Sequence, residues 1–406
     1  TMEIPWNLTK TVIGGTPEQV LFVDSVDQVF LDQKLLCLPE CDTIVGIGGG
    51  LAVDAAKYFC WKRNLRLVTI PTVLSVNAFV TPATGIRINR EVKYVGITSP
   101  DPLIIDYDIL RTAPQSLNIA GIGDLLSIHT ASFDWEYAES KGKSEYAFSD
   151  LAIKEAKSIL MDICSMASEI RDVTNKSLLA IVEGYMKLNA ICIPLDHFRV
   201  EEGSEHFLFY ELEERLRRSF IHGHIIGLGI YLMSRLQDNQ AEHITEILNR
   251  TKLDYHPRDL GIKRQDLVDS LKNLKSFVRN KPQLWFTIID GTEISDETLG
   301  IIIDWSALWI TKDLLAPPFL GGLVIIFFNI GQLIAKLMAV QLIKLTSEKF
   351  IGGYLVFIGS TFYFFSILLS DLYTIVAISF VFGFSISNFV AILMRLGVKL
   401  SPDNIP

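Results

Sequence analysis

The sequence of 406 residues predicts an α/β domain, then a helical domain, then a C-terminal hydrophobic region with about three transmembrane helices. In the first part, short apolar segments alternate with segments that have helical periodicity or carry Gly and Pro, as in α/β proteins. Residues 113–250 repeat apolar positions at i, i+3, i+4 and i+7, which indicates amphipathic helices. Long apolar runs without either period follow Leu314. The predicted domains are therefore 1–112, 113–312 and 313–406, which suits roughly 100–200 residues per domain.

Three short apolar segments, TIVGI, LRLVTI and LIID, are predicted to be strands of the first domain. Two further segments, TGIRI and VKYVGI, flank Asn89-Arg90-Glu91 and predict a β-hairpin laid onto that sheet. Later in the chain, the segment DLAIKEAKSILMDICSMASEI places its apolar residues on one helical face. A strand-rich first part is thus followed by a helical second part.

Charge is unevenly distributed along the chain. The formal net charge is -9, and 32 basic and 43 acidic residues remain when the five basic and three acidic residues from Leu314 onward are set aside. This acidic body argues against nucleic-acid binding, which needs clustered Lys and Arg. The five cysteines are odd in number and scattered, which indicates reduced thiols in a cytosolic compartment.

Three apolar runs in the last region have about the length that crosses a hydrocarbon core: Phe319–Ala335, Phe350–Leu369 and Leu372–Leu393. As a soluble core they would need a very large apolar partner, so we expect membrane insertion. The positive-inside rule places the lysine-containing loop after the first run, and the segment after the third run, in the cytoplasm. Three spans would then put the acidic body outside, although its N-terminal segment has no apolar secretory signal. Either the first run does not cross the membrane, or the acidic body and the apolar C-terminal region did not evolve together as one protein.

A glycine turn follows the first predicted strand. Gly48, Gly49 and Gly50 lead into a helix-like stretch that carries Asp54 and Lys57. Glycine allows close approach to the backbone, and a helix N-terminus offers unpaired N–H groups to phosphate. The spacing is GGGxxxD rather than GxGxxG, so the dinucleotide fingerprint is not met as such. A phosphate cradle and a plain tight turn are both compatible with this segment.

A second polar segment, IPTVLSVNAFVTPATGIR, begins at the end of the next predicted strand. Thr72 and Ser75 place hydroxyl groups near the carboxyl edge of a parallel sheet, where such sheets bind ligands. The alternative is a polar loop without a ligand.

One carboxylate and several imidazoles could form a metal site. Asp124 follows a glycine turn, and His206 and His222 are sixteen residues apart. Such a three-ligand set leaves a coordination position for a substrate oxygen. His197 and His224 lie nearby, so the residue pattern by itself leaves the choice among the histidines open, and structural roles remain an alternative.

Five motifs in order carry a family resemblance: GIGGGLAVDAAK, PTVLSVNAFVTP, AGIGDLLS with Asp134-Trp135, GSEH, and HGHIIGLG. In order and spacing they resemble sn-glycerol-1-phosphate dehydrogenases, within the iron-containing alcohol dehydrogenase and dehydroquinate synthase-like superfamily. The resemblance covers about residues 20–310. It implies a dehydroquinate synthase-like fold, with an α/β nucleotide-binding domain followed by an all-α metal-binding domain.

The resemblance also implies roles for individual residues. Its NAD(P)-binding positions fall on Gly48, Gly49, Gly50, Asp54, Thr72, Ser75 and Thr81. Its ligands for Zn²⁺ or Fe²⁺ fall on Asp124, His206 and His222. Its substrate positions fall on Asn77, Asp124 and Tyr210, and Asp124 is also its catalytic position.

This sequence departs from the family at several of these positions. Asn77 stands where the family usually has Asp, Tyr210 where it has His, and Thr81 where it has Ser. His224 stands where the family usually has Glu and is not a ligand there. Only some 45 residues precede the glycine turn, so the first strand–helix unit is expected to be shortened or absent. The cofactor and metal pattern is kept, while the substrate pattern is eroded.

The leading hypothesis is an NAD(P)- and metal-dependent oxidoreductase that interconverts dihydroxyacetone phosphate and sn-glycerol-1-phosphate, or a similar polyol. The alternatives are a catalytically weakened, membrane-attached protein that binds nucleotide or metal, and a dehydrogenase fused to a transporter fragment. The last idea rests on APPFLGGLVIIFFNIGQLIAKLMAVQLIKL, which loosely resembles helices of a major facilitator transporter without that family's charged loop motif. The expected partners are a small phosphorylated polyol, a membrane at the C-terminal region and further copies of the chain, but no nucleic acid. The expected location is a membrane, with the enzymatic domain in the cytoplasm.

Overall fold

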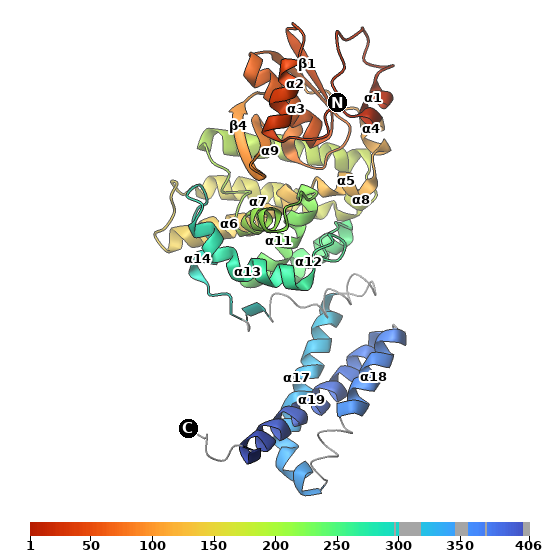
Figure 1. Cartoon of the computed structure of the whole chain (residues 1–406), viewed down its shortest axis with the longest axis vertical. Coiled ribbons are helices and arrows are strands. Elements are labelled where there is room, and N and C mark those ends of the chain that lie inside the picture. The colour runs from red at the N-terminus through yellow and green to blue at the C-terminus, as the bar shows by residue number, and fades with distance from the viewer. Residues whose placement is uncertain (296–297, 300–317, 346–355, 370–371, 401–406) are drawn as a thin grey trace. The chain divides into compact units, whose positions relative to one another are not determined.

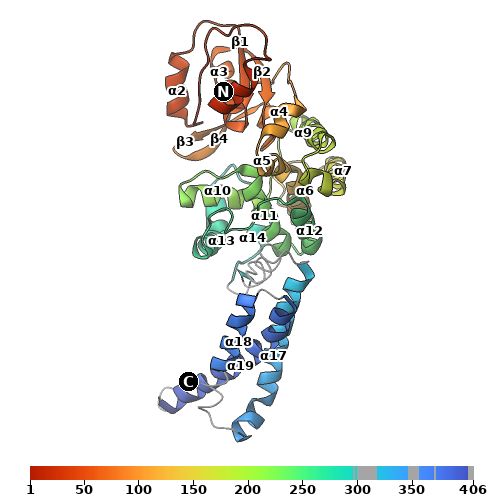
Figure 2. The same cartoon turned by 90° about the vertical axis from the view of Figure 1, so that its right-hand side faces the viewer.

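The computed structural model describes residues 1–295, 298–299, 318–345, 356–369 and 372–400. The chain divides into two compact units, Thr1–Ile303 and Asp304–Pro406, which are drawn in Figures 1 and 2 and described separately here. The boundaries predicted after residues 112 and 312 stay predictions.

The first unit begins with a small parallel sheet and its helices, which gather at one end of the unit (Figure 1). Strands β1 (Thr43–Gly48) and β2 (Arg66–Pro71) pair in parallel, with Thr43 opposite Arg66. Helix α3 (Gly50–Arg63) connects them and buries one side against the sheet. It ends at Asn64 in the left-handed conformation, which is a common way to terminate a helix. Helices α1 (Glu3–Thr9) and α2 (Gln28–Leu36) precede β1 in the chain.

The predicted hairpin is present as β3 (Ala83–Ile88) and β4 (Glu91–Ile97), which pair antiparallel. Its turn consists of Asn89 and Arg90, with φ values of 52° and 72°. Positive φ at both central residues is the pattern of a type I′ turn, whose twist matches that of paired strands. Glu91, which we expected in the connection, is the first residue of β4.

The third predicted strand, LIID, is reduced to a single parallel bridge between Leu103 and Thr69. Asp101 N, Ile104 N and the Pro102 carbonyl oxygen do bond to the backbone of β2. The bonds of this segment to β2 end at Ile104, so LIID does not form a regular strand.

Helices form the rest of the first unit, as the periodicity predicts. Capping side chains mark several of their starts: Ser149 accepts from Ala152 N and Thr174 accepts from Ser177 N. Within the described residues, the 3₁₀ turn η1 and the helices have these bounds: η1 (Asn77–Phe79), α4 (Tyr107–Thr112), α5 (Gln115–Ala120), α6 (Gly123–Ser140), α7 (Asp150–Ser165), α8 (Ala167–Arg171), α9 (Asn175–Leu195), α10 (Ser204–Leu216), α11 (His222–Leu236), α12 (Ala241–Thr251), α13 (Arg264–Arg279) and α14 (Ile288–Gly291).

The described part of the second unit consists of three apolar helices: α17 (Pro318–Leu345), α18 (Val356–Leu369) and α19 (Leu372–Leu400). They cover the first and third apolar runs of the sequence and most of the second, whose residues 350–355 lie outside the described residues. Helices α17 and α19 approach closely, because a Cβ added to Gly331 would lie 2.2 Å from the Phe380 carbonyl oxygen.

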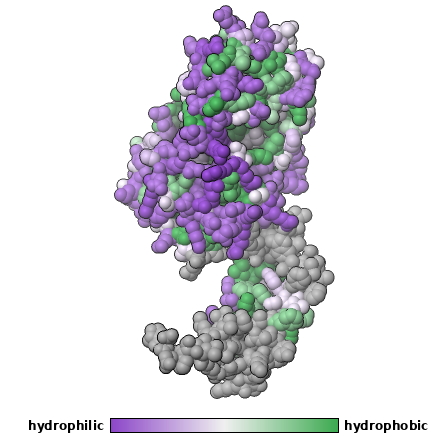
Figure 3. Space-filling model, viewed as in Figure 1, coloured by the Kyte–Doolittle hydropathy of each residue, from purple (hydrophilic) through white to green (hydrophobic). Residues whose placement is uncertain are grey.

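The structure does not support the predicted transmembrane helices. Within the described residues, only α9 has both the length and the mean hydropathy (1.5) of a membrane span, and 44% of that window is buried inside the protein. A core helix of a soluble protein passes the same test, so this is weak support. The apolar stretches Leu323–Met338 and Tyr373–Ser387 are shorter. In the space-filling view of Figure 3, the visible face of the first unit is mainly hydrophilic.

Candidate functional site

Asp124, His206 and His222 come together in the first unit, from the starts of α6, α10 and α11. Asp124 Oδ1 lies 2.8 Å from His222 Nε2 and 3.6 Å from His206 Nε2. One ligand atom from each residue lies within 4.8 Å of the others. Asp124 and His206 are buried, whereas His222 is partly exposed. His222 is therefore the member of the cluster that reaches solvent.

Two glycines next to this cluster determine how closely its helices meet. Gly123 precedes Asp124, and Gly223 follows His222. A Cβ on Gly123 would lie 2.4 Å from Gly223 Cα, and one on Gly223 would lie 1.7 Å from the Ala120 carbonyl oxygen. Both obstacles are backbone atoms that a side-chain rotation cannot remove. The starts of α6 and α11 can thus touch only without side chains, and this contact brings Asp124 to His222.

A second carboxylate orients His206. Glu205 Oε1 lies 2.8 Å from His206 Nδ1 and also accepts from Gly203 N at 2.7 Å. Its other oxygen accepts from the Thr130 hydroxyl at 2.7 Å, and the Glu205 side chain is fully buried. A carboxylate on one ring nitrogen makes that nitrogen the protonated one and leaves Nε2 free to bind a metal.

The electrostatics of the cluster match this arrangement. Burial acts to raise the pKa of Asp124, but the neighbouring His222 and His206 outweigh it and hold that pKa well below its usual range. For His206, burial acts to lower the pKa, while Asp124 and Glu205 together raise it well above the ordinary value. The cluster therefore stabilises a positive charge, which either a bound proton or a metal ion can supply.

The three residues fit a divalent metal. Asp124 Oδ1 is buried and, among the described residues, accepts no hydrogen bond of acceptable geometry, although both histidines are close. A buried carboxylate oxygen that faces two imidazole nitrogens is the arrangement of a three-ligand metal site. The other candidate histidines lie elsewhere: His197 packs against the Trp135 ring at 4.9 Å, and His224 Nε2 lies 3.1 Å from the Ser116 carbonyl oxygen.

The cluster opens into a cleft of about 300 Å³, which we call the metal cleft. Its walls also include the first turn of α3, the loop after β2, the hairpin and the loop before α11. Eight of the residues predicted as site residues line it: Gly50, Asp54, Ser75, Asn77, Thr81, Asp124, His206 and His222. The cofactor and metal predictions therefore point to one cavity.

The glycine turn leaves no room for side chains. A Cβ on Gly49 would lie 2.8 Å from Val73 Cγ1, and one on Gly50 would lie 2.4 Å from Val76 Cγ1. Gly49 is the N-cap of α3 and provides no capping side chain. The first N–H groups of α3 thus start beside the loop that carries Ser75, which suits an anionic group.

The remaining predicted cofactor residues hold this region together. Lys57, which is fully buried, lies 2.9 Å from Asp54 Oδ1 and donates to the Thr81 and Ala83 carbonyl oxygens. Thr72 N donates to the Gly48 carbonyl oxygen at 3.1 Å. Gly48, Gly49 and Thr72 support the cleft from behind and do not line it.

The predicted substrate residues divide between two cavities. Asp124 lines the metal cleft, and Tyr210 lines an adjoining cavity of about 570 Å³, which we call the side pocket. Asn77 lines both cavities. The substrate positions named from the sequence therefore extend beyond the metal cluster.

Two ion pairs join the hairpin to residues of the helical part, and their members are among the residues that line the two cavities. Arg87 Nη2 lies 2.9 Å from Glu213 Oε2, and Lys281 Nζ lies 2.9 Å from Glu91 Oε1. Glu213 is almost fully buried in its pair, while both members of the other pair are partly exposed.

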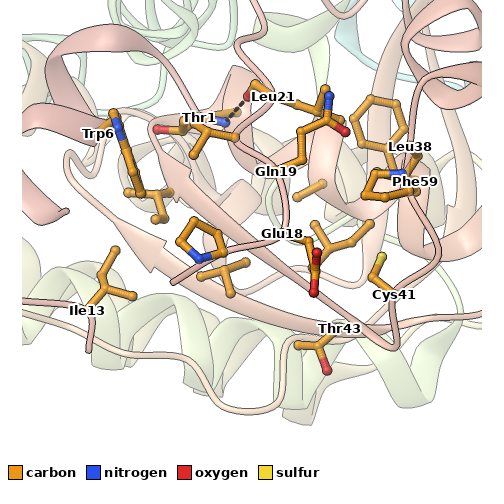
Figure 4. A pocket seen from close by; sticks show the side chains of 18 of the residues that line it. Thr1, Trp6, Ile13, Glu18, Gln19, Leu21, Leu38, Cys41, Thr43 and Phe59 are labelled. Atoms are coloured by element: carbon orange, nitrogen blue, oxygen red, sulfur yellow. Dashed lines mark hydrogen bonds between the residues drawn. The ribbon is translucent and has the colours of Figure 1, made fainter. Parts of the chain in front are cut away.

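A larger hollow of about 850 Å³ lies beside β1 and the N-terminal segment (Figure 4). Its walls include Trp6, Leu21, Leu38 and Phe59, and none of the predicted site residues lines it. This hollow is apart from the metal cluster, so size alone does not identify the functional cavity.

Sequence reasoning missed two buried acids beside the cluster, Glu205 and Glu201. Glu205 was available in the motif GSEH as the neighbour of a metal histidine, but nothing in the pattern showed which way it points. Glu201 lines both cavities, and burial and the charge of Asp124 raise its pKa well above the usual range.

Comparison with known proteins gives consistent results. Residues 19–114 match the family model for iron-containing alcohol dehydrogenase. Over 266 residues, the chain is 30% identical to glycerol-1-phosphate dehydrogenase [NAD(P)+] of Hyperthermus butylicus, covering 64% of this chain and 75% of that protein. The protein of the same name from Aeropyrum pernix is 29% identical over 238 residues, covering 57% of this chain and 65% of that protein.

Solved structures share the fold at lower sequence identity. Glycerol dehydrogenase from Schizosaccharomyces pombe matches with a TM-score of 0.57 and 20% identity, over 77% of this chain and 84% of that one. A probable glycerol dehydrogenase from Sinorhizobium meliloti matches with a TM-score of 0.56 and 18% identity, over 74% and 86%. These matches show a nucleotide-binding domain followed by a helical domain.

Proposed function

The chain belongs to the glycerol-1-phosphate dehydrogenase family, and from this premise we propose that it is an NAD(P)- and metal-dependent oxidoreductase of small polyols. The substrate pair to expect first is dihydroxyacetone phosphate and sn-glycerol-1-phosphate. The observation that carries the proposal is the convergence of Asp124, His206 and His222 on one cleft with the glycine turn of α3.

The residues of the cleft suit this chemistry. Asp124 Oδ1 and the Nε2 atoms of His206 and His222 would hold Zn²⁺ or Fe²⁺, with Glu205 fixing the His206 ring. Gly50 and Ser75, which line the cleft at the start of α3, would receive the cofactor phosphates. When bound, the metal polarises a carbonyl oxygen and the reduced nicotinamide supplies a hydride.

The direct test is turnover by the purified chain. Dihydroxyacetone phosphate, NADH or NADPH, and Zn²⁺ or Fe²⁺ should together consume reduced cofactor, and omission of the metal after chelation should stop consumption. Absence of turnover, together with no metal retained after mild dialysis, would contradict the proposal.

We further propose that the C-terminal unit associates with a membrane while residues 1–303 act in the cytoplasm, and that the chain assembles with copies of itself. Large apolar side chains on α17 support the membrane part: Leu333 is 57% exposed and Leu337 is 74% exposed. Fractionation of cells that express the full chain should recover it with membranes, and extraction should require detergent rather than high salt. Recovery in the aqueous fraction would contradict the membrane part, and size-exclusion chromatography with light scattering tests assembly.

The second candidate is a membrane-attached protein that binds cofactor without turnover. Asn77 and Tyr210, which depart from the family pattern, favour it. Measured NADH affinity without oxidation across a panel of polyol phosphates would support this candidate over the first.

A further inference from the structure

The metal cleft and the side pocket are continuous in their walls. Seven residues line both cavities: Asn77, Thr81, Ala83, Val92, Tyr94, Glu201 and Glu202. A three-carbon substrate at the metal cluster would occupy the metal cleft and leave the side pocket of about 570 Å³ unused.

The side pocket has the chemistry of a site for hydroxyl groups. Tyr94, Tyr146 and Trp285 contribute aromatic surface to it. Two of its lysines already have carboxylate partners: Lys281 lies within 2.9 Å of Glu91 and 2.8 Å of Glu214, and Lys93 lies 2.8 Å from Glu91. Aromatic faces with hydrogen-bonding carboxylates suit a neutral, hydroxylated chain better than a second phosphate.

Glu201 stands where the two cavities meet, and one of its oxygens needs a partner. Its side chain is buried at 3% exposure, and within the described residues Oε2 has no hydrogen-bond partner. Ser127 bonds to the backbone carbonyl oxygen of Glu201 and so fixes the residue without using its carboxyl group. A buried carboxyl oxygen without a partner is destabilising, and a hydroxyl from a ligand would satisfy it.

From these contacts we infer that the substrate extends from the metal cleft into the side pocket, where Glu201 hydrogen-bonds a hydroxyl on the extension. The preferred substrate class is then a polyol, or its keto form, of four or more carbons. This inference rests on the proposed function, because it concerns the same reaction at the same metal cluster. Tyr210 and Asn77 would both contact the extended substrate, because Tyr210 lines only the side pocket and Asn77 lines both cavities.

The first test compares ketose 1-phosphates that differ only at the end away from the phosphate. Dihydroxyacetone phosphate has three carbons, and erythrulose 1-phosphate and xylulose 1-phosphate add one and two hydroxymethylene groups. We expect the metal-loaded full chain to reduce the four- or five-carbon compound with a kcat/KM at least equal to that for dihydroxyacetone phosphate. Turnover of dihydroxyacetone phosphate without turnover of the longer compounds would overturn the inference and leave the proposed function standing. Turnover of the longer compounds alone would support the inference and reject dihydroxyacetone phosphate as substrate, while turnover of none would reject both.

The second test uses variants and reports the ratio of kcat/KM between the four-carbon and three-carbon substrates. Glu201→Ala should lower this ratio at least tenfold through KM, with metal content unchanged, and Glu201→Gln should restore part of it. Leu284→Trp, which fills the side pocket, should lower the ratio similarly. Leu179→Trp is the matched control on the surface of α9, where Leu179 is 43% exposed, and should leave the ratio unchanged. Equal losses for both substrates in Glu201→Ala and Leu284→Trp would show a structural role only and would overturn the inference.

Discussion

At the scale of single residues, the metal cluster depends on which imidazoles face one another. Four of the histidines lie between His197 and His224, and the residue pattern by itself could not separate them. In the structure His206 and His222 reach Asp124, while His197 and His224 are buried among aromatic and backbone groups. The family resemblance named the same pair, and their role as ligands stays a prediction for experiment.

We predict that His222→Ala removes the metal and at least about 99% of activity, because a site with two remaining ligands holds a divalent ion poorly. Metal per chain after dialysis, measured by atomic emission, checks the first part. His243→Ala, at an exposed position on α12, is the matched control and should keep the metal. Full metal content in His222→Ala would show that the cluster is not the binding site.

At the scale of elements, sequence reasoning found the pieces but not their contacts. The strands β1 and β2 and the hairpin were predicted, because apolar segments and turn residues are local signals. The LIID segment makes only one bridge to β2, because an apolar run does not by itself show that its backbone pairs with a neighbouring strand. The contact between Gly123 and Gly223 was invisible in the sequence, because it joins residues a hundred positions apart.

We predict that Gly223→Ala destabilises the protein by about 1–3 kcal/mol or more and weakens metal binding, since its methyl group would meet the Ala120 carbonyl oxygen. Chemical denaturation and metal titration measure the two effects. Gly184→Ala on α9 is the control, because the atoms nearest its added methyl group are Leu125 side-chain carbons that can shift. A Gly223→Ala protein with native stability and metal affinity would contradict this account of the α6–α11 contact.

Asp134 links two elements and predicts a pH dependence. Its carboxylate accepts from Ser204 N at the start of α10 and from Ile288 N at the start of α14. Burial, and then the charge of Glu205, raise the pKa of Asp134 to about 7. In an unfolded chain an Asp has a pKa of about 3.9. The folded state therefore binds the proton more tightly, and the stabilisation present below about pH 4 is lost as the pH rises through about 7.

We expect the free energy of unfolding to fall between pH 5 and pH 8, by at most about 3 kcal/mol from this group. Urea titrations across this range should show a shallower fall in Asp134→Asn, whose side chain does not titrate. An identical slope in the two proteins would assign the pH dependence to other buried acids.

At the scale of the whole molecule, the chain combines a dehydrogenase unit with an apolar unit. The resemblance from about residue 20 to 310 anticipated the first unit, which spans Thr1–Ile303. The apolar runs correctly predicted helices in the second unit where it is described, but the expected transmembrane character is not supported. Hydropathy reports how apolar a segment is, and it does not report what covers that segment.

We predict that residues 1–303 expressed alone fold and bind metal and NADH as the full chain does, because the metal cleft and the glycine turn lie entirely within this unit. Circular dichroism, metal content and NADH titration check this outcome. An aggregated product, or a folded one with NADH affinity lowered tenfold or more, would show that the second unit contributes to the site.

The two ion pairs of the hairpin give it an uneven attachment to the helices. Salt weakens ion pairs between solvent-exposed charges and affects buried pairs much less. The pair of Lys281 and Glu91, whose members are both partly exposed, should weaken first as ionic strength rises. The pair of Arg87 and Glu213, in which Glu213 is almost fully buried, should persist. At high ionic strength the hairpin would therefore be held to the helical part mainly by the buried pair of Arg87 and Glu213.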